Sequence, residues 1–229
     1  MSEEIKKMFA DIADKYDFMN NLLSFGLHHL WRKKAVKISG AKFGDKVLDC
    51  ACGTGDLAIQ FKKTVGDRGN VEGIDFCAEM LPIAQKKAES KHLDIDFNQG
   101  DALNLQFADN TFDVCSIAFG IRNVDNPEKC IFEMARVVKS GGKVVVLEFG
   151  QAKGFIRLLY RIFSYSIMPL SGKIFVKNKT AYTYLPRTAE KFPCREDFLK
   201  IMDITYLFTK TKYYSLSSGI AFIYIGKVV

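Results

Sequence analysis

Residues 47–58 read Val-Leu-Asp-Cys-Ala-Cys-Gly-Thr-Gly-Asp-Leu-Ala. The apolar start of this stretch predicts a buried strand, and the residues after Asp56 predict an amphipathic helix. Gly53 and Gly55 lie between the two, where a ligand can approach backbone that carries no side chain. The start of the helix offers unpaired N–H groups. We therefore expect a ligand-binding turn at the carboxyl end of a strand.

The segments around this turn alternate between strand and helix patterns. Strand patterns fall at residues 46–51, 70–75, 95–99, 112–117 and 143–149, and helix patterns fall at 56–65, 78–91 and 127–138. Such alternation predicts an α/β fold with a doubly wound, mostly parallel sheet. A helix at 192–202 precedes strands at 205–211 and 219–228, which 212–218 join as an antiparallel hairpin. The prediction is a Rossmann-like sheet of seven strands, with its ligand site at the carboxyl ends of the parallel strands.

The N-terminal part of the chain is predicted to be helical. Apolar residues recur at steps of three and four over residues 3–18, and the pattern breaks at 14–21. Ser24 is the predicted N-cap of a second helix, which runs towards Ile38 and is closed by Gly40 and Gly44.

The chain is expected to form a single domain over residues 1–229, because 229 residues with 48% apolar content can bury a large core. Residues 1–40 are interpreted either as a helical lid, with Tyr16 and Asn20 over the ligand, or as plain packing helices.

Cysteine and histidine are not arranged as metal ligands. The six cysteines lack paired spacing, and several fall in apolar patterns, so we interpret them as reduced core thiols. With three histidines in the chain, no metal is expected.

Two classes of ligand use a glycine turn of this kind, namely dinucleotides and S-adenosylmethionine (SAM). The spacing Gly53-x-Gly55-x-x-Ala58 fits the loose dinucleotide fingerprint. Asp75 ends the second strand, where an acid accepts hydrogen bonds from ribose hydroxyls in either class, or else caps the next helix. These residues leave the choice between the two ligands open.

Acidic residues near the turn favour SAM. Asp49 is placed to receive the positive amino group of SAM, whereas it would repel the pyrophosphate of a dinucleotide. Asp101 closes the third strand, where it can accept from an adenine amino group. An aromatic face attracts a sulfonium, and Phe119 or Tyr16 offers one unless both are ordinary core residues. An α/β sheet that ends in an antiparallel hairpin also looks like the class I methyltransferase arrangement.

Blocks along nearly the whole chain resemble one family. They include Phe9-x-x-Ile12-Ala13-x-x-Tyr16-Asp17-x-Met19-Asn20, Ser24-Phe25-Gly26-x-His28-x-x-Trp31-Arg32, Ala118-Phe119-Gly120-Ile121-Arg122-Asn123-Val124, Glu133-Met134-x-Arg136-Val137, and Tyr182-x-Tyr184-Leu185. The chain closely resembles the UbiE-type ubiquinone/menaquinone biosynthesis C-methyltransferases. The resemblance implies SAM-dependent C-methylation of a polyprenylated quinol ring. Whether the ring is a benzoquinol or a naphthoquinol stays open.

The resemblance carries SAM contacts onto Thr54, Asp75, Asp101 and Ala102, and onto Ala118, where the family commonly has a serine. Together with the turn and its flanks, the predicted cofactor site comprises Asp49, Gly53, Thr54, Gly55, Asp75, Phe76, Asp101, Ala102 and Ala118. Phe119 and Tyr184 are predicted on the substrate side.

Methylation of a ring carbon needs a group that stabilises a phenolate and a weak base that removes the ring proton. Arg122 is predicted either to stabilise the phenolate or to form a structural salt bridge, and Asn123 to orient the hydroxyl. Asp101 or His28 is predicted to take the proton, with water as a relay, although a lone helical histidine is more often a packing residue.

Residues 151–190 form a basic, aromatic-rich insertion. No Asp or Glu lies between Phe149 and Ala189, whereas seven basic residues do, which equals the net charge of +7. The insertion is expected to cover the substrate pocket, to form a homodimer face or to contact an anionic membrane through 153–179. A core-packing lid with a solvated basic edge is the alternative. A partner in a quinone-synthesis complex also stays open. We expect a cytoplasmic protein that contacts the inner face of the membrane peripherally.

Four other functions match parts of the sequence. The glycine spacing and Asp75 would suit an NAD(P)-binding oxidoreductase, but the negative charge of Asp49 argues against this function. A methyltransferase with another small-molecule or lipid acceptor shares the cofactor motif. Nucleic-acid binding is not expected, because the basic residues accompany bulky apolar ones rather than a broad Lys/Arg face. A catalytically inactive scaffold is disfavoured by the intact cofactor motif.

Overall fold

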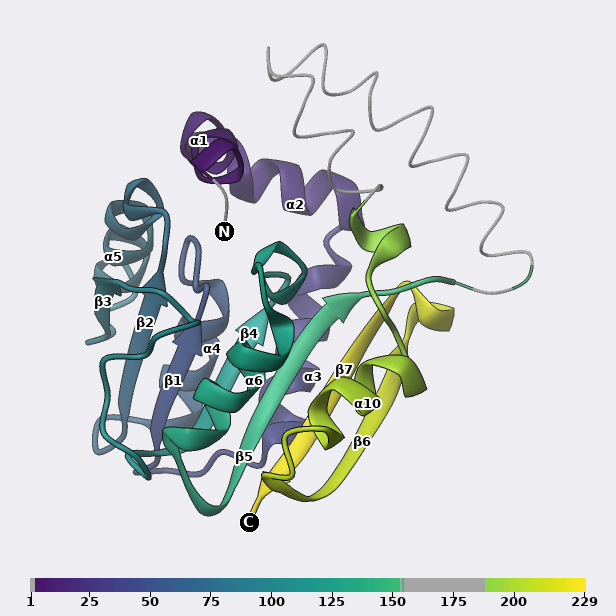
Figure 1. Ribbon diagram of the computed structural model, residues 1–229. Coiled ribbons are helices and arrows are strands. Elements are labelled where there is room, and N and C mark those ends of the chain that lie inside the picture. The colour runs from purple at the N-terminus through teal and green to yellow at the C-terminus, as the bar shows by residue number, and fades with distance from the viewer. Residues whose placement is uncertain (1–2, 153, 155–187) are drawn as a thin grey trace.

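The computed structural model describes residues 3–152, 154 and 188–229 (Figure 1). Its centre is a seven-stranded sheet in the order β3-β2-β1-β4-β5-β7-β6. The strands are β1 Lys46–Cys50, β2 Asn70–Asp75, β3 Asp96–Gln99, β4 Phe112–Ala118, β5 Val138–Phe149, β6 Phe208–Leu216 and β7 Ala221–Val228. Strands β1 to β5 pair in parallel, and β7 pairs antiparallel with β5 and β6. The predicted mostly parallel sheet with an antiparallel hairpin is confirmed.

Helices cover both faces of the sheet, which is why its central strands are apolar on both sides (Figure 1). One face packs against α6 Pro127–Arg136 and α10 Glu196–Asp203, with Met134 and Phe198 completely buried. The other face packs against α3 Leu27–Ser39, α4 Asp56–Val65 and α5 Leu81–Glu89, with Ala35 and Phe61 completely buried. The doubly wound prediction therefore holds, and reading the chain as one domain stays a prediction.

The N-terminal helices differ from the sequence prediction. Helix α1 spans Glu3–Ile12, a 3₁₀ turn spans Ala13–Lys15, and α2 spans Tyr16–Ser24, so the pattern breaks for one turn only. The prediction that Ser24 caps the next helix is wrong, since α3 starts after Gly26. Phe25 and Gly26 both have positive φ, which turns the chain between the two helices. Gly40 ends α3 as predicted, with a φ of 70°.

The C-terminal hairpin has a shorter connection than predicted. Strand β6 continues to Leu216, so the predicted link at 212–218 is mostly strand. The reason is burial, because Tyr213 packs against the core on one face of the sheet and Tyr214 against the core on the other. The turn is reduced to the 3₁₀ segment Ser217–Gly219.

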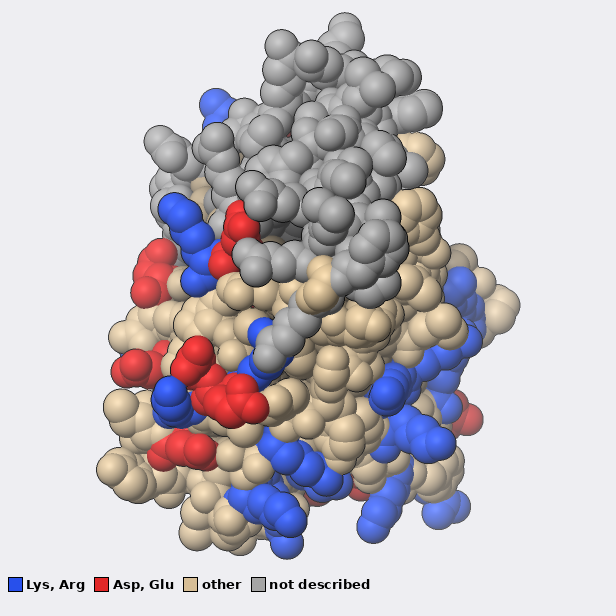
Figure 2. All heavy atoms as spheres, turned by 90° about the vertical axis from the view of Figure 1, so that its right-hand side faces the viewer, with Lys and Arg blue, Asp and Glu red and all other residues tan. Residues whose placement is uncertain are grey.

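Exposed lysines gather on the sheet edge formed by β6. Lys210 and Lys212 on β6 and Lys227 on β7 are exposed, and Lys210 pairs directly with Lys227. Figure 2, which views this side of the molecule, shows Lys and Arg concentrated on its lower part. Like charges placed opposite each other cost stability, but lysines on an edge strand discourage pairing with another chain.

The predicted insertion is mostly outside the described residues. This applies to Tyr184 and, apart from Gly154, to the membrane-contact stretch 153–179. Among the helices of the described ranges, none is both long and apolar enough to cross a membrane.

The carboxyl ends of β1, β2, β3 and β4 meet at one edge of the sheet. Helices α1 and α2 pass above this edge (Figure 1). A small apolar cluster joins them to the segment after β2, where Ala13 packs with Cys77 and Met80. The predicted ligand edge is therefore covered by the N-terminal helices.

Candidate cofactor site

The turn after β1 is held by hydrogen bonds from its own backbone. Cys52 N donates to Ile74 O at 3.0 Å, and Gly53 N donates to Asp75 Oδ2 at 2.8 Å. Asp75 Oδ1 accepts from Cys77 N at 2.8 Å. Burial raises the pKa of Asp75, and these backbone hydrogen bonds offset part of the rise. Asp75 thus fastens the end of β2 both to the glycine turn and to the segment that follows.

Gly55 is required for two reasons. Its φ is 82°, and a Cβ there would lie 2.9 Å from Phe97 Cζ and 3.0 Å from Ala84 Cβ. We expect Gly55→Ala to lower the free energy of unfolding by about 3 kcal/mol, from backbone strain plus overpacking. Gly44→Ala is the matched control, because Gly44 has a φ of 88° and nothing within 4 Å of the added Cβ. Strain alone predicts a loss of about 1 kcal/mol there. Urea unfolding of both variants measures the difference, and equal losses would contradict the packing argument.

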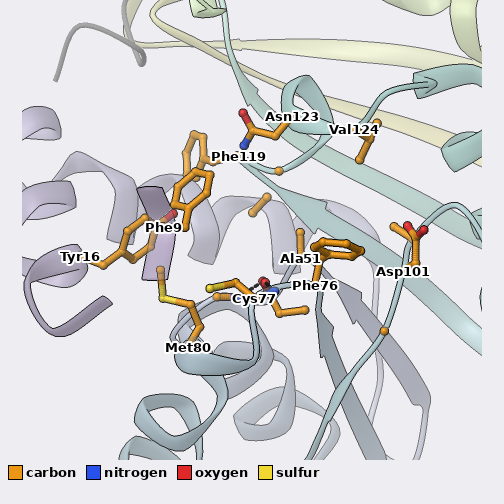
Figure 3. Close-up of a pocket in the computed structure, with 16 residues that line it drawn as sticks. Phe9, Tyr16, Ala51, Phe76, Cys77, Met80, Asp101, Phe119, Asn123 and Val124 are labelled. Atoms are coloured by element: carbon orange, nitrogen blue, oxygen red, sulfur yellow. Dashed lines mark hydrogen bonds between the residues drawn. The ribbon is translucent and has the colours of Figure 1, made fainter. Parts of the chain in front are cut away.

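A pocket lies at this edge, between the strand ends and the N-terminal helices (Figure 3). It brings together many of the predicted site residues, namely Tyr16, Gly53, Asp75, Phe76, Asp101, Ala102, Ala118, Phe119 and Asn123. Figure 3 shows Phe9 and Tyr16 on one side of the pocket and Asp101 on the other. The pocket therefore has acidic groups at the strand ends and aromatic rings beneath the helices.

Several predicted residues do not line this pocket. They are Asn20, His28, Asp49, Thr54, Gly55 and Arg122. Burial raises the pKa of the Tyr16 phenol. Asn20 Nδ2 is buried and has no hydrogen-bond partner among the described residues.

Asp49 is 1% exposed and lies beneath the turn. Its Oδ1 accepts a hydrogen bond from Ser116 Oγ at 2.8 Å. Its Oδ2 is buried and has no hydrogen-bond partner among the described residues. Burial raises the pKa of Asp49 to about 7, although the Ser116 hydrogen bond opposes the shift. An orphaned buried carboxylate oxygen is costly, and a cationic group would satisfy it.

Arg122 forms a buried ion pair. Its Nη1 lies 2.5 Å from Glu148 Oε1, with the two side chains 5% and 1% exposed, and also donates to Phe119 O at 2.7 Å. Glu148 further accepts from Phe149 N at 2.8 Å. Burial raises the pKa of Glu148, and the Arg122 charge offsets part of this. This geometry favours the salt-bridge interpretation of Arg122, and direct stabilisation of a phenolate stays a prediction.

A family model settles the relationship of the chain to known proteins. The model of the ubiE/COQ5 methyltransferase family matches residues 1–228. The chain belongs to this family.

Individual proteins agree with this assignment. The chain is 56% identical over 227 residues to the ubiquinone/menaquinone biosynthesis C-methyltransferase UbiE of Bdellovibrio bacteriovorus, covering 99% of this chain and 96% of that protein. It is 39% identical over 225 residues to a demethylmenaquinone methyltransferase of Staphylococcus aureus, covering 98% and 92%. The fold is similar to that of a SAM-dependent methyltransferase from Aquifex aeolicus, with a TM-score of 0.68, 19% identity and coverage of 93% and 98%. The sequence-based family resemblance is confirmed.

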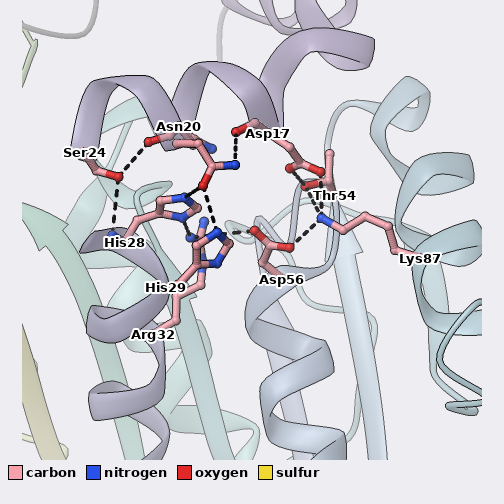
Figure 4. Close-up of polar contacts among 10 residues, drawn as sticks. Asp17, Asn20, Ser24, His28, His29, Arg32, Thr54, Asp56 and Lys87 are labelled. Carbon is pink, nitrogen blue, oxygen red and sulfur yellow. Dashed lines mark hydrogen bonds and ion pairs between the residues drawn. The ribbon is translucent and has the colours of Figure 1, made fainter. Parts of the chain in front are cut away.

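His28 of this ubiE/COQ5 family member lies away from the pocket, in a polar cluster (Figure 4). Its ring contacts Asn21 Oδ1 at 3.2 Å and the Arg32 guanidinium. Burial first, and then the positive Arg32, lower the pKa of His28 to about 3. His28 does not face the pocket, whereas Asp101 lines it, so Asp101 is the better candidate of the two predicted bases.

The same cluster contains the one metal-like group found among the described residues. Ligand atoms of His28, His29 and Asp56 lie within 4.8 Å of one another. Arg32 and Lys87 already neutralise Asp56, at 3.8 Å and 2.5 Å. A cation would have to displace both positive groups, so this donor set does not fit a metal.

Some pocket residues of this methyltransferase were not predicted. Phe9, Cys77, Met80 and Val124 also line the pocket. Phe9 packs edge-on against Tyr16, with 6.1 Å between ring centroids. Phe9 could have been predicted as a pocket residue, because it precedes Tyr16 by two helical turns within one family block.

Proposed function

We propose that this methyltransferase transfers the methyl group of SAM to a ring carbon of a polyprenylated quinol. The combination in one pocket of carboxylates at the strand ends with aromatic rings carries the proposal. A nucleoside suits Asp75 and Asp101, and an aromatic ring suits Phe9, Tyr16 and Phe119. The named activities of the relatives support a quinol as acceptor.

The donor fits the residues present. When bound, SAM supplies a methyl group activated by a sulfonium. Asp49 would hold the amino group through its unpartnered Oδ2, Asp75 the ribose and Asp101 the adenine. The excess positive charge of such a ligand suits three buried or half-buried acids.

The remaining residues would orient the acceptor and exclude water, which is the main demand of an in-line displacement. Asn123 lines the pocket and would orient a ring hydroxyl. Arg122 would act by holding the Phe119 carbonyl, and with it the pocket wall. Asp101, whose carboxylate lines the pocket, would act as the weak base that removes the ring proton, with water as a relay.

Incubation with methyl-labelled SAM and each candidate quinol tests this proposal. Demethylmenaquinol and a methoxy-polyprenyl benzoquinol are offered separately, and label in the extracted quinol is the expected result. Binding of SAM without label in either quinol favours the second candidate, a methyltransferase with another acceptor. Titration of NAD in place of SAM addresses the oxidoreductase alternative.

Three further expectations stay predictions. They are membrane contact through 153–179, a homodimer and membership of a quinone-synthesis complex. A cytoplasmic protein attached peripherally to the membrane would meet a substrate dissolved in the bilayer. Flotation with anionic and neutral liposomes tests the membrane contact.

A further inference from the structure

Lys87, on helix α5, joins three segments that are far apart in the sequence (Figure 4). Its Nζ donates to Asp17 Oδ2 at 2.8 Å, to Asp56 Oδ1 at 2.5 Å and to Thr54 Oγ1 at 3.2 Å. An ammonium group has three N–H donors, so all three are used. The contacts fasten α5 to α2, to the glycine turn and to the start of α4.

A second contact joins α2 to the glycine turn without Lys87. Thr54 Oγ1 donates to Asp17 Oδ1 at 2.5 Å, and Thr54 is 3% exposed. Its hydroxyl therefore faces this cluster rather than the pocket, although the family resemblance made Thr54 a SAM contact. The side chain of a turn residue thus holds the N-terminal helices.

Charge makes Lys87 the key member of the cluster. Asp17 and Asp56 both face it, and the other nearby cation, Arg32, lies 3.8 Å from Asp56. Without the ammonium group, two carboxylates from α2 and α4 would repel each other. Arg32 and Lys87 together lower the pKa of Asp56 against the effect of its burial.

This cluster bears on the pocket through the neighbour of Asp17. Tyr16 precedes it at the start of α2 and lines the pocket. Phe9 on α1 packs against Tyr16 and lines the pocket too. Any movement of Asp17 away from the turn carries this aromatic wall with it.

We infer that Lys87 is a positioning residue for cofactor binding, because it fastens α2 to the glycine turn and so keeps Tyr16 and Phe9 over the pocket. The inference rests on the proposed function for the identity of the cofactor. In this arrangement the ammonium group acts together with the Thr54–Asp17 hydrogen bond to hold the N-terminal helices over the pocket. Many exposed ion pairs contribute almost nothing, but Lys87 is 23% exposed, and its partners Asp56 and Asp17 are 16% and 36% exposed, so the cluster is partly shielded from water.

Lys87→Met tests the inference, with Lys86→Met as the matched control. Lys86 is exposed on the same helix, and its loss removes the same charge. For Lys87→Met we expect faster amide hydrogen exchange over residues 3–24 and a Kd for SAM about tenfold higher. The KM for SAM should rise by about the same factor, with kcat at saturating SAM within about twofold. Lys86→Met should match the native chain.

Two further variants guard against simple misfolding. Lys87→Arg keeps a cation between Asp17 and Asp56 and should restore most of the SAM affinity. Asp17→Asn removes the same contact from the other partner and should raise the Kd for SAM to a similar extent. Native SAM affinity and native exchange in Lys87→Met would overturn the inference, as would equal effects in Lys86→Met.

The exchange experiment separates this inference from the proposed function. If the native chain does not bind SAM, the proposed function fails, whereas exchange over residues 3–24 without ligand still tests the contact between Lys87 and α2. If the native chain methylates a quinol and Lys87→Met behaves like it in every readout, only the inference fails.

Discussion

The free energy of unfolding of Arg122→Met is expected to be about 3 kcal/mol lower than that of the native chain, because the substitution leaves the Glu148 carboxylate buried without its counter-charge. Glu148 is completely buried, and Arg122 provides its nearest positive group at 2.5 Å. Loss of the guanidinium also frees the Phe119 carbonyl at the pocket wall. Urea unfolding monitored by circular dichroism measures the stability, and the same samples give the methyl-transfer rate.

The double variant Arg122→Met/Glu148→Gln separates stability from chemistry. Glutamine keeps an acceptor for Phe149 N but removes the buried charge, so most of the lost stability should return. Arg122→Lys completes the series by keeping the charge without the planar fork. A stable double variant with native turnover would exclude any catalytic need for the guanidinium. A stable but inactive one would show that turnover needs the guanidinium, either to hold the Phe119 carbonyl or to stabilise a phenolate. No loss of stability in Arg122→Met would contradict the buried ion pair.

Asp49→Asn is expected to weaken SAM binding about a hundredfold at pH 8, because it removes a desolvated partner of the amino group. The same carboxyl makes native binding depend on pH. With a pKa of about 7, Asp49 is mainly protonated at pH 6, and binding the ammonium group then requires release of a proton. The affinity should rise about tenfold per pH unit below 7 and level off above it. Isothermal titration from pH 5.5 to 8.5 measures this slope, which Asp49→Asn should lack.

Folding provides an internal control for this variant. The folded-state pKa of Asp49 lies above its unfolded value, so its contribution to stability is present at low pH and is lost as pH rises through about 7. Asparagine does not ionise, so this loss of stability does not occur in Asp49→Asn. Without ligand, the variant should therefore be at least as stable as the native chain at pH 8. Asp67→Asn removes an exposed carboxylate and should change neither property. A Kd for SAM that does not vary with pH in the native chain would contradict the role of Asp49.

The sequence predicts the sheet because its signals are local. The strand at 70–75 and the helix at 56–65 match β2 and α4 residue for residue, since apolar patterns and glycines mark their ends. Gly53 and Asp101 follow β1 and β3, Asp75 ends β2, and parallel strands bring their carboxyl ends together. Much of the pocket is therefore predictable from the sequence alone.

The remaining features depend on contacts between distant segments. Arg122 pairs with Glu148 across 26 positions, and Thr54 pairs with Asp17 across 37. No local pattern distinguishes a buried arginine that holds a wall from one that touches a substrate. The prediction that Ser24 caps α3 is wrong for a different reason. The chain reverses through a positive φ at Phe25, and phenylalanine rarely adopts a positive φ.

The atom of the acceptor that receives the methyl group distinguishes C-methylation from O-methylation. The product of the labelled-SAM reaction with demethylmenaquinol is purified, acetylated and analysed by mass spectrometry and NMR. We expect one new methyl group on a ring carbon, with the ring proton lost and both hydroxyls still free to be acetylated. A methyl group on oxygen, or no methylated product with either quinol, would contradict it.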